Sequence, residues 1–147
     1  NETKTLYITV NPEPVADFSG TPRPVCVGDN VTFTDNSTNA ATWSWSFPGG
    51  TPGSANTVGP HTVVYANPGT YTVSLLVTNS CGSDNETKTV YITVNPYPNA
   101  DFYANKLTIC AGDNVTFTDN STNAATWSWS FPGGTPESGR ASWRERV

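Results

Sequence analysis

The sequence has little charge, no methionine and a single histidine, and these shortages narrow what the chain can do. Lysine, arginine, aspartate and glutamate make up 13% of the 147 residues, and the net charge is −5. Proteins that bind nucleic acid present a basic face, so the composition argues against that function. With one histidine and no Cys-x-x-Cys pair, a zinc site is not expected either.

Long apolar runs and strong helix formers are also scarce. The sequence contains no stretch of about 18 apolar residues, which a transmembrane helix requires. Threonine, asparagine, serine, valine, glycine and proline dominate instead, and this mixture favours short strands joined by turns. Nothing in the sequence matches a nucleophile elbow, a phosphate loop or a metal-ligand cluster. We therefore predict an all-β protein that is not an enzyme.

The dominant feature of the sequence is an internal repeat with an offset of 84 residues. Residues 1–52 recur as 85–136 without a gap, and 41 of the 52 aligned positions are identical. Most differences fall at 19–27 against 103–111, and there the cysteine is kept, as Cys26 and Cys110. A unit of this length suits a small sandwich domain rather than a solenoid repeat of roughly 20–50 residues.

Proline pairs mark the boundaries between the repeats. Asn11-Pro12-Glu13-Pro14 and Asn95-Pro96-Tyr97-Pro98 are equivalent, and prolines two residues apart end a strand and stiffen a linker. We therefore divide the chain into the last strand of a truncated module with its linker (1–12), a complete module (13–96), the first half of a further module (97–136) and a tail (137–147).

Two of these parts carry a specific expectation. The half-module 97–136 lacks the strands that match 53–95, so we expect it to be poorly ordered, with Cys110 unpaired. The tail departs from the repeat and holds three of the chain's four arginines in its last eight residues. We expect the tail to be non-native.

Within the complete module, several short segments alternate apolar and polar residues. They predict strands at 31–34, 42–47, 62–65, 71–77 and 87–94. Strands with one apolar face predict an antiparallel sandwich in which two sheets bury those faces against each other. The residues expected to face this core are Trp43, Trp45, Phe47, Tyr71, Val73, Leu75, Val77, Val90, Ile92 and Val94.

These motifs resemble the PKD (polycystic-kidney-disease) domain family. Trp45-Ser46-Phe47 and the turn at Gly49 and Gly50 match the family's Trp-x-Phe strand motif, although the family's commonest turn is Gly-Asp-Gly. Residues 69–79, which include Tyr71, Val73 and Leu75, match its Gly-Thr-Tyr-x-Val-x-Leu-x-Val-x-Asn signature. The motif Ser-Phe-Pro-Gly-Gly-Thr-Pro resembles a variant found in bacterial surface and secreted proteins. The resemblance implies immunoglobulin-like sandwich modules in tandem, outside the cell.

Two functions remain open for such modules. As a spacer or stalk, they would contact neighbouring modules of the same chain and hold parts of a larger surface or secreted protein apart. As an adhesion module, they would bind polysaccharide or a surface protein through the loop 53–60 and the variable patch 19–25, with any enzyme domain elsewhere in the parent chain. A contiguous exposed aromatic patch would favour adhesion, and its absence would favour the spacer.

Two candidate sites follow from this setting. An extracellular compartment predicts a disulfide between Cys26 and Cys81, with two separate thiols as the alternative. Asp35 and Asn36 carry oxygens of the kind that calcium prefers, but turn capping explains the same pair of residues. We expect no other cofactor.

Overall fold

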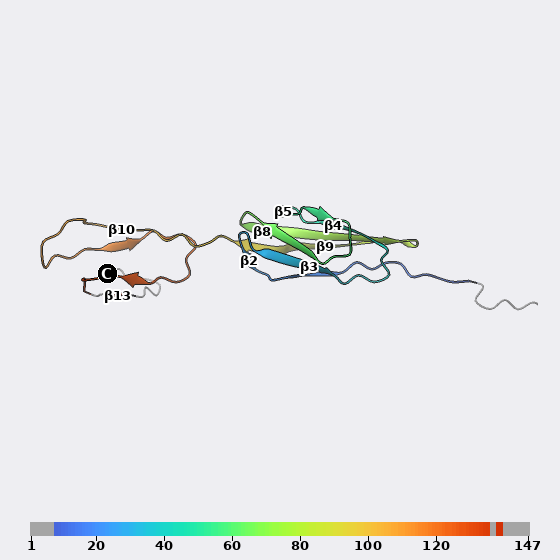
Figure 1. Ribbon diagram of the computed structural model, residues 1–147, viewed down its shortest axis with the longest axis horizontal. Helices are drawn as coiled ribbons and strands as arrows, with labels where there is room; N and C mark the ends of the chain where they lie inside the picture. Colours follow the sequence, from blue (N-terminus) through green and yellow to red (C-terminus); the bar gives the residue numbers. More distant parts are fainter. Residues whose placement is uncertain (1–7, 136–137, 140–147) are drawn as a thin grey trace, which may run out of the picture. The chain divides into compact units, whose positions relative to one another are not determined.

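The structure is a computed structural model that describes residues 8–135 and 138–139 (Figure 1). It divides into two units, Asn1–Pro96 and Tyr97–Val147, which are treated separately below. Most of the predicted first strand (1–10) and most of the tail (137–147) lie outside the described residues.

The first unit is a two-layer β-sandwich without helices in its described part. One sheet has the order β1 (Phe18–Thr21), β3 (Asn30–Asp35), β7 (His61–Tyr65) and β5 (Gly50–Thr51). The other has the order β2 (Val25–Cys26), β9 (Gly82–Asn95), β8 (Gly69–Asn79), β4 (Thr42–Ser46) and β6 (Ser54–Ala55). The pair β2–β9 is parallel and the other pairs are antiparallel. The predicted all-β sandwich is confirmed.

All five predicted strands are present, and the structure extends two of them considerably. β8 has 11 residues and β9 has 14, and the two form one long hairpin that runs along the whole module (Figure 1). The remaining strands, β1, β2, β5 and β6, have two to four residues each. Segments this short contain too few residues to show an alternating pattern, and so they were not predicted.

The core lies between the two sheets and is centred on aromatic rings. Trp45 stacks on Phe47 at 5.7 Å between ring centroids, and Phe18 meets Trp45 edge-on at 5.4 Å. Such stacked and edge-on pairs are the favoured aromatic geometries. The buried hydrophobic residues are Ala16, Phe18, Val25, Val31, Phe33, Trp45, Phe47, Val63, Tyr65, Val73, Leu75, Val77, Ile92 and Val94. Trp43 and Tyr71 are half-buried against this cluster.

Val90 does not face the core, contrary to the expected alternation. Its side chain is 67% exposed, and its backbone has a φ of 51°. The β8–β9 register shifts here, because Tyr71 pairs with Ile92 whereas Val73 pairs with Lys88. Three residues of β9 therefore lie opposite one residue of β8, and this bulge turns Val90 outward. Strict period-two reasoning fails wherever a strand contains a bulge.

The second unit forms two small ladders. β10 (Phe102–Ala104) pairs with β11 (Phe117–Asp119), and β12 (Trp129–Ser130) pairs with β13 (Ser138–Gly139). Every described side chain from residue 97 to residue 135 is partly or fully exposed. In the described parts of both units, no helix is long and apolar enough to cross a membrane.

Candidate functional sites at the two ends of the module

The chain enters the complete module at the end that carries the β8–β9 turn. The Asn79 side-chain amide donates hydrogen bonds to the carbonyls of Pro12 (2.9 Å) and Asn39 (2.8 Å). The Cys81 thiol donates to the carbonyl of Asn11 at 3.3 Å. The backbone of the entering linker is therefore held against this turn by side chains of the module that it enters.

The chain leaves the module at the opposite end of β9. There the short strand β2 runs parallel to β9, with Cys26 in register with Asn95. The Val27 amide donates a hydrogen bond to the Asn95 carbonyl at 3.0 Å. Ladder pairing thus continues to the residue before Pro96, which has no amide hydrogen to extend it.

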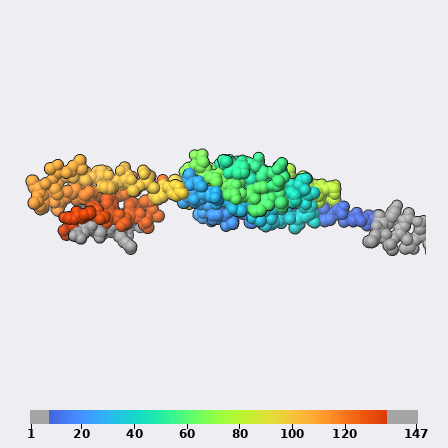
Figure 2. Space-filling model, viewed as in Figure 1, coloured from blue at the N-terminus to red at the C-terminus, as the bar shows by residue number. Residues whose placement is uncertain are grey.

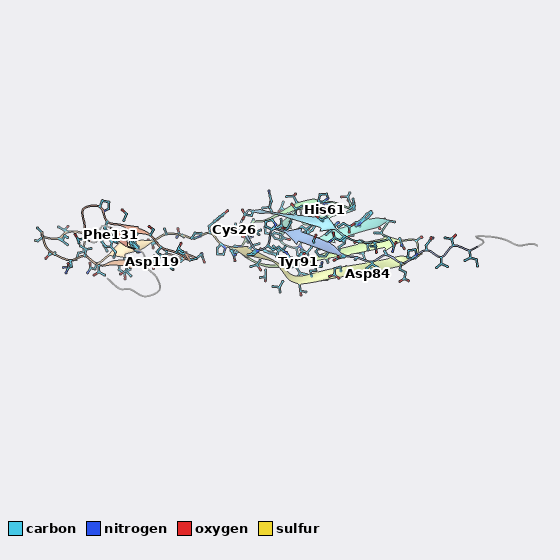
Figure 3. All side chains as sticks on the ribbon, turned by 90° about the horizontal axis from the view of Figure 1, so that it is seen from below. Cys26, His61, Asp84, Tyr91, Asp119 and Phe131 are labelled. Atoms are coloured by element: carbon cyan, nitrogen blue, oxygen red, sulfur yellow. The ribbon has the colours of Figure 1, made fainter. Side chains whose placement is uncertain are left out.

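Entry and exit are separated by nearly the whole length of β9. At about 3.3 Å per residue, its 14 residues correspond to about 40 Å. Figure 3 shows this separation, with Cys26 near one end of the module and Asp84, three residues after Cys81, near the other. The space-filling view shows the module between these ends as a closely packed body (Figure 2).

The predicted disulfide between Cys26 and Cys81 is wrong for a single module. Cys26, Cys81 and Cys110 are all free thiols in the structure. Cys26 lies beside the last residue of β9, and Cys81 directly precedes its first residue. A disulfide requires Cα atoms within about 7 Å, and β9 keeps these two about 40 Å apart. The spacing of cysteines along a sequence does not reveal at which end of a domain each one lies.

The candidate calcium residues are engaged by protein donors. The two carboxylate oxygens of Asp35 accept hydrogen bonds from the Ser37 amide (3.1 Å) and from the Trp43 indole (2.9 Å). The Asn36 backbone amide donates a hydrogen bond to the Asp17 carbonyl at 2.9 Å. No group of three or more His, Cys, Asp or Glu residues in the described ranges is placed to hold a metal ion. In this structure Asp35 and Asn36 fix a turn and orient the half-buried Trp43.

All eight aromatic side chains of the complete module are buried or half-buried: Phe18, Phe33, Trp43, Trp45, Phe47, Tyr65, Tyr71 and Tyr91. The Trp45 indole also donates to the Thr57 carbonyl at 3.0 Å, and the His61 ring nitrogen Nε2 lies 2.9 Å from the same oxygen. The loop 53–60 is therefore tied to the core through its backbone. Such a contact between a core tryptophan and a distant loop has no signature in the sequence.

A lysine on the last strand joins the two sheets at the surface. Lys88 Nζ lies 3.0 Å from a carboxylate oxygen of Asp17 and 4.5 Å from the centre of the Phe18 ring, and it also donates to the Phe18 carbonyl. This lysine lowers the pKa of Asp17, mainly through their hydrogen bond. Lysine over an aromatic face is a favourable cation–π arrangement. The lysine strengthens the seam between β1 and β9.

Comparison with models of known protein families shows to which family the chain is related. The model of the PKD domain family matches residues 11–94, which is more than half of the chain. The chain belongs to the PKD domain family. The matched region runs from the linker held by Cys81 to the last buried residue of β9, so the family match covers the complete module from its entry to its exit.

Other comparisons add little beyond the family. A search of curated protein sequences finds no match. A solved structure from work on "the promiscuous specificity of the carbohydrate-binding modules from the beta-sandwich super family" is similar, with a TM-score of 0.48 and 24% sequence identity. The match covers 74% of this chain and 54% of that one, so the PKD chain spans about half of that structure's length.

Proposed function

We propose that the complete module is a non-catalytic spacer in a larger extracellular surface or secreted protein, of the repeat type found in bacteria. The observation that carries this proposal is the path of the chain, which enters beside Cys81 and leaves beside Cys26 at opposite ends of β9. Each copy on such a path adds its own length of about 40 Å to the protein. A domain whose termini lie side by side would add almost none.

The fixed linker contacts support the same function. Asn79 and Cys81 hold the backbone on the entry side, and the Val27 amide holds Asn95 on the exit side. Freedom between modules is then confined to the short segment around Pro96 and Pro98, where proline restricts the backbone further. A stalk that keeps its partners apart needs this limit on bending.

The placement of the aromatic residues favours the spacer over the adhesion alternative. A sugar-binding platform presents aromatic faces to solvent, and all eight aromatic side chains of the module are buried or half-buried instead. The large apolar side chains that residues 13–95 do expose are aliphatic: Val15, Val58, Leu76 and Val90.

A distance measurement across the module tests the proposal. Cys110→Ser leaves Cys26 and Cys81 as native positions for nitroxide labels, and pulsed electron spin resonance then reports their separation. We expect one narrow distribution centred near about 40 Å, and a broad distribution for the same sample in denaturant as the control. A broad distribution in native buffer, or a mean separation about half as long, would contradict a rigid spacer.

Sedimentation with insoluble polysaccharides tests the adhesion alternative. The spacer proposal predicts that the chain stays in the supernatant. Sedimentation that Val58→Asp abolishes and Leu76→Asp leaves intact would locate a binding site at the loop 53–60, because Val58 is the exposed apolar residue of that loop and Leu76 lies on β8. That result would replace the spacer with an adhesion module.

A further inference from the structure

We propose that Cys26 of one module forms a disulfide with the counterpart of Cys81 in the module that follows it. This proposal deepens the spacer function and rests on it for an oxidising, extracellular setting. It starts from the repeat: Asn11 and Asn95 are the same position 84 residues apart, and each is followed by a proline. The contacts of Asn11 therefore show how a linker enters a module, and the contacts of Asn95 show how the equivalent linker leaves one.

Cys81 lies at the end of the module where a linker enters. Its amide donates to the side-chain oxygen of Asn79 at 2.7 Å, which sets the turn. Its thiol points at the linker and contacts the carbonyl of Asn11 at 3.3 Å, while the residue stays exposed. The Cys81 sulfur is thus directed toward the chain that arrives from the preceding module.

Cys26 lies at the end of the module where a linker leaves. It is the register partner of Asn95 on the neighbouring strand, and the next residue, Val27, holds the Asn95 carbonyl. Strands pair at about 4.8 Å, so the Cys26 backbone lies one strand spacing from Asn95. Its side chain is partly exposed.

In two consecutive complete modules, the linker that leaves the first is the linker that enters the second. Asn95 would then be the register partner of Cys26 in its own module, and its carbonyl would accept hydrogen bonds from both the Val27 amide and the thiol of the incoming counterpart of Cys81. The strand spacing, the peptide dimensions and the 3.3 Å sulfur–oxygen contact together bring the incoming sulfur to within about 11 Å of the Cys26 Cα. This is an upper bound. The same linker residue is the register partner of Cys26 and the acceptor for the incoming thiol.

The repeat itself supplies a second, independent observation. Between 19–27 and 103–111 every aligned residue differs except the cysteine, Cys26 against Cys110. The same fold keeps Cys26 about 40 Å from Cys81 of its own module. A cysteine that is kept where its surroundings change, and that has no partner within reach in its own module, is explained by a partner in the next one.

The disulfide would form by ordinary thiol–disulfide exchange. The two thiols lose two protons and two electrons, and a sulfur–sulfur bond forms between the modules. A low-molecular-weight disulfide such as oxidised glutathione accepts the electrons through a mixed disulfide and leaves as two thiols. This disulfide would join the two modules across the linker at Asn95 and Pro96, and so limit bending between them.

The proposal is tested on a protein in which the second module is made complete. Residues 53–96 are appended after Pro136 in place of the tail, so the chain holds Cys26, Cys81, Cys110 and a new counterpart of Cys81. The protein is folded in a glutathione redox buffer, its free thiols are alkylated, and it is cleaved before aspartate. Cleavage before Asp17, Asp29, Asp35, Asp84, Asp101 and Asp113 places Cys26, Cys81 and Cys110 on separate peptides: 17–28, 35–83 and 101–112. The appended cysteine would fall on a peptide with the same sequence as 35–83, because residues 35–52 recur as 119–136, so the appended copy carries Ser54→Thr to separate the two peptides by mass.

The expected product is a single cross-link between peptide 17–28 and the peptide of the appended segment, with Cys81 and Cys110 alkylated. Cys26→Ser should abolish the cross-link without transferring it to Cys110. Alkylation of all four cysteines, or a bridge from Cys26 to Cys81, would overturn the proposal. The spacer function fails separately, because its label distance is measured on the unextended chain without any bridge.

Discussion

Residues 28–52 and 112–136 have the same 25-residue sequence but lie in different surroundings. Their aromatic rings adopt the same arrangement in both places. Phe33 and Phe47 lie 4.8 Å apart at 34°, and Phe117 and Phe131 lie 4.9 Å apart at 33°. The tryptophan next to them stacks at 5.7 Å and 19° in both copies. The identical sequence thus adopts the same ring geometry in both copies.

Burial and strand length differ between the same two segments. Phe33 is fully buried, whereas its counterpart Phe117 is 38% exposed. The strand that contains Phe33 has six residues, and the one that contains Phe117 has three. In the complete module, β7 pairs with β3 and β8 pairs with β4. The comparison shows that these later strands, rather than the sequence of the segment itself, supply burial and the extended ladder.

The largest expected difference between the copies is the effect of removing a tryptophan. Trp45→Ala should lower the free energy of unfolding of the complete module by about 3–5 kcal/mol, the range for a buried large aromatic. The matched change Trp129→Ala, in the same local sequence, should leave that transition unchanged. Urea unfolding of both variants measures the effect. Equal losses would mean that the two units unfold together and that burial does not separate them.

A glycine pair sharpens the comparison. Gly49 and Gly133 have nearly equal φ values of 78° and 77°, so alanine is strained at both. A Cβ at Gly49 would lie 2.4 Å from the Tyr71 ring, whereas one at Gly133 meets no described atom within 4 Å. We expect Gly49→Ala to destabilise the complete module by about 2–4 kcal/mol, and Gly133→Ala to leave its unfolding midpoint in place. A mild effect of Gly49→Ala would mean that Tyr71 moves aside easily.

The smallest expected effect concerns Tyr65 on β7, a strand that has no counterpart in residues 97–136. Burial raises the pKa of Tyr65 to about 12, and its hydroxyl has no hydrogen-bond partner among the described residues. The unfolded chain ionises this tyrosine near pH 10 while the folded module keeps it neutral. The contribution of Tyr65 to stability is therefore constant below pH 10 and falls by about 2–3 kcal/mol toward pH 12.

Tyr65→Phe is the matched variant for this effect. It should lose this part of the alkaline destabilisation, and at pH 7 it should be as stable as the parent or slightly more so, because an unpaired buried hydroxyl is removed. Unfolding curves of the two proteins at pH 7, 10 and 11.5 provide the measurement. An identical decline in both would assign the alkaline loss to other groups.

The sequence was sufficient to predict the parts of the fold that alternate cleanly. The five longer strands and the core residues Trp45, Phe47, Val73 and Leu75 all follow from alternating apolar residues, and the structure confirms them. Val90 was missed because a bulge changes the period without any glycine or proline to announce it.

The sites were harder to predict, because they depend on which end of the module each residue reaches. Cys26 and Cys81 are both exposed to solvent to some degree, and their sequence separation fits a bridge. Two facts place them apart: β9 extends for 14 residues, and β2 joins it in parallel at its far end. Neither the length of a strand beyond its alternating part nor a two-residue parallel pairing is visible in the sequence.

Amide hydrogen exchange tests most directly whether partner strands, and not local sequence, fold these identical segments. Residues 31–47 and 115–131 have the same sequence and so the same intrinsic exchange rates, and NMR separates the two copies where peptide masses would coincide. We expect the amides of 31–47 to exchange at least about 1,000-fold more slowly than their intrinsic rates, as suits a domain with about 5 kcal/mol of stability. The amides of 115–131 should exchange near those rates. Equally slow exchange in both segments would contradict this explanation, because the second copy would then be folded without the strands that bury the first.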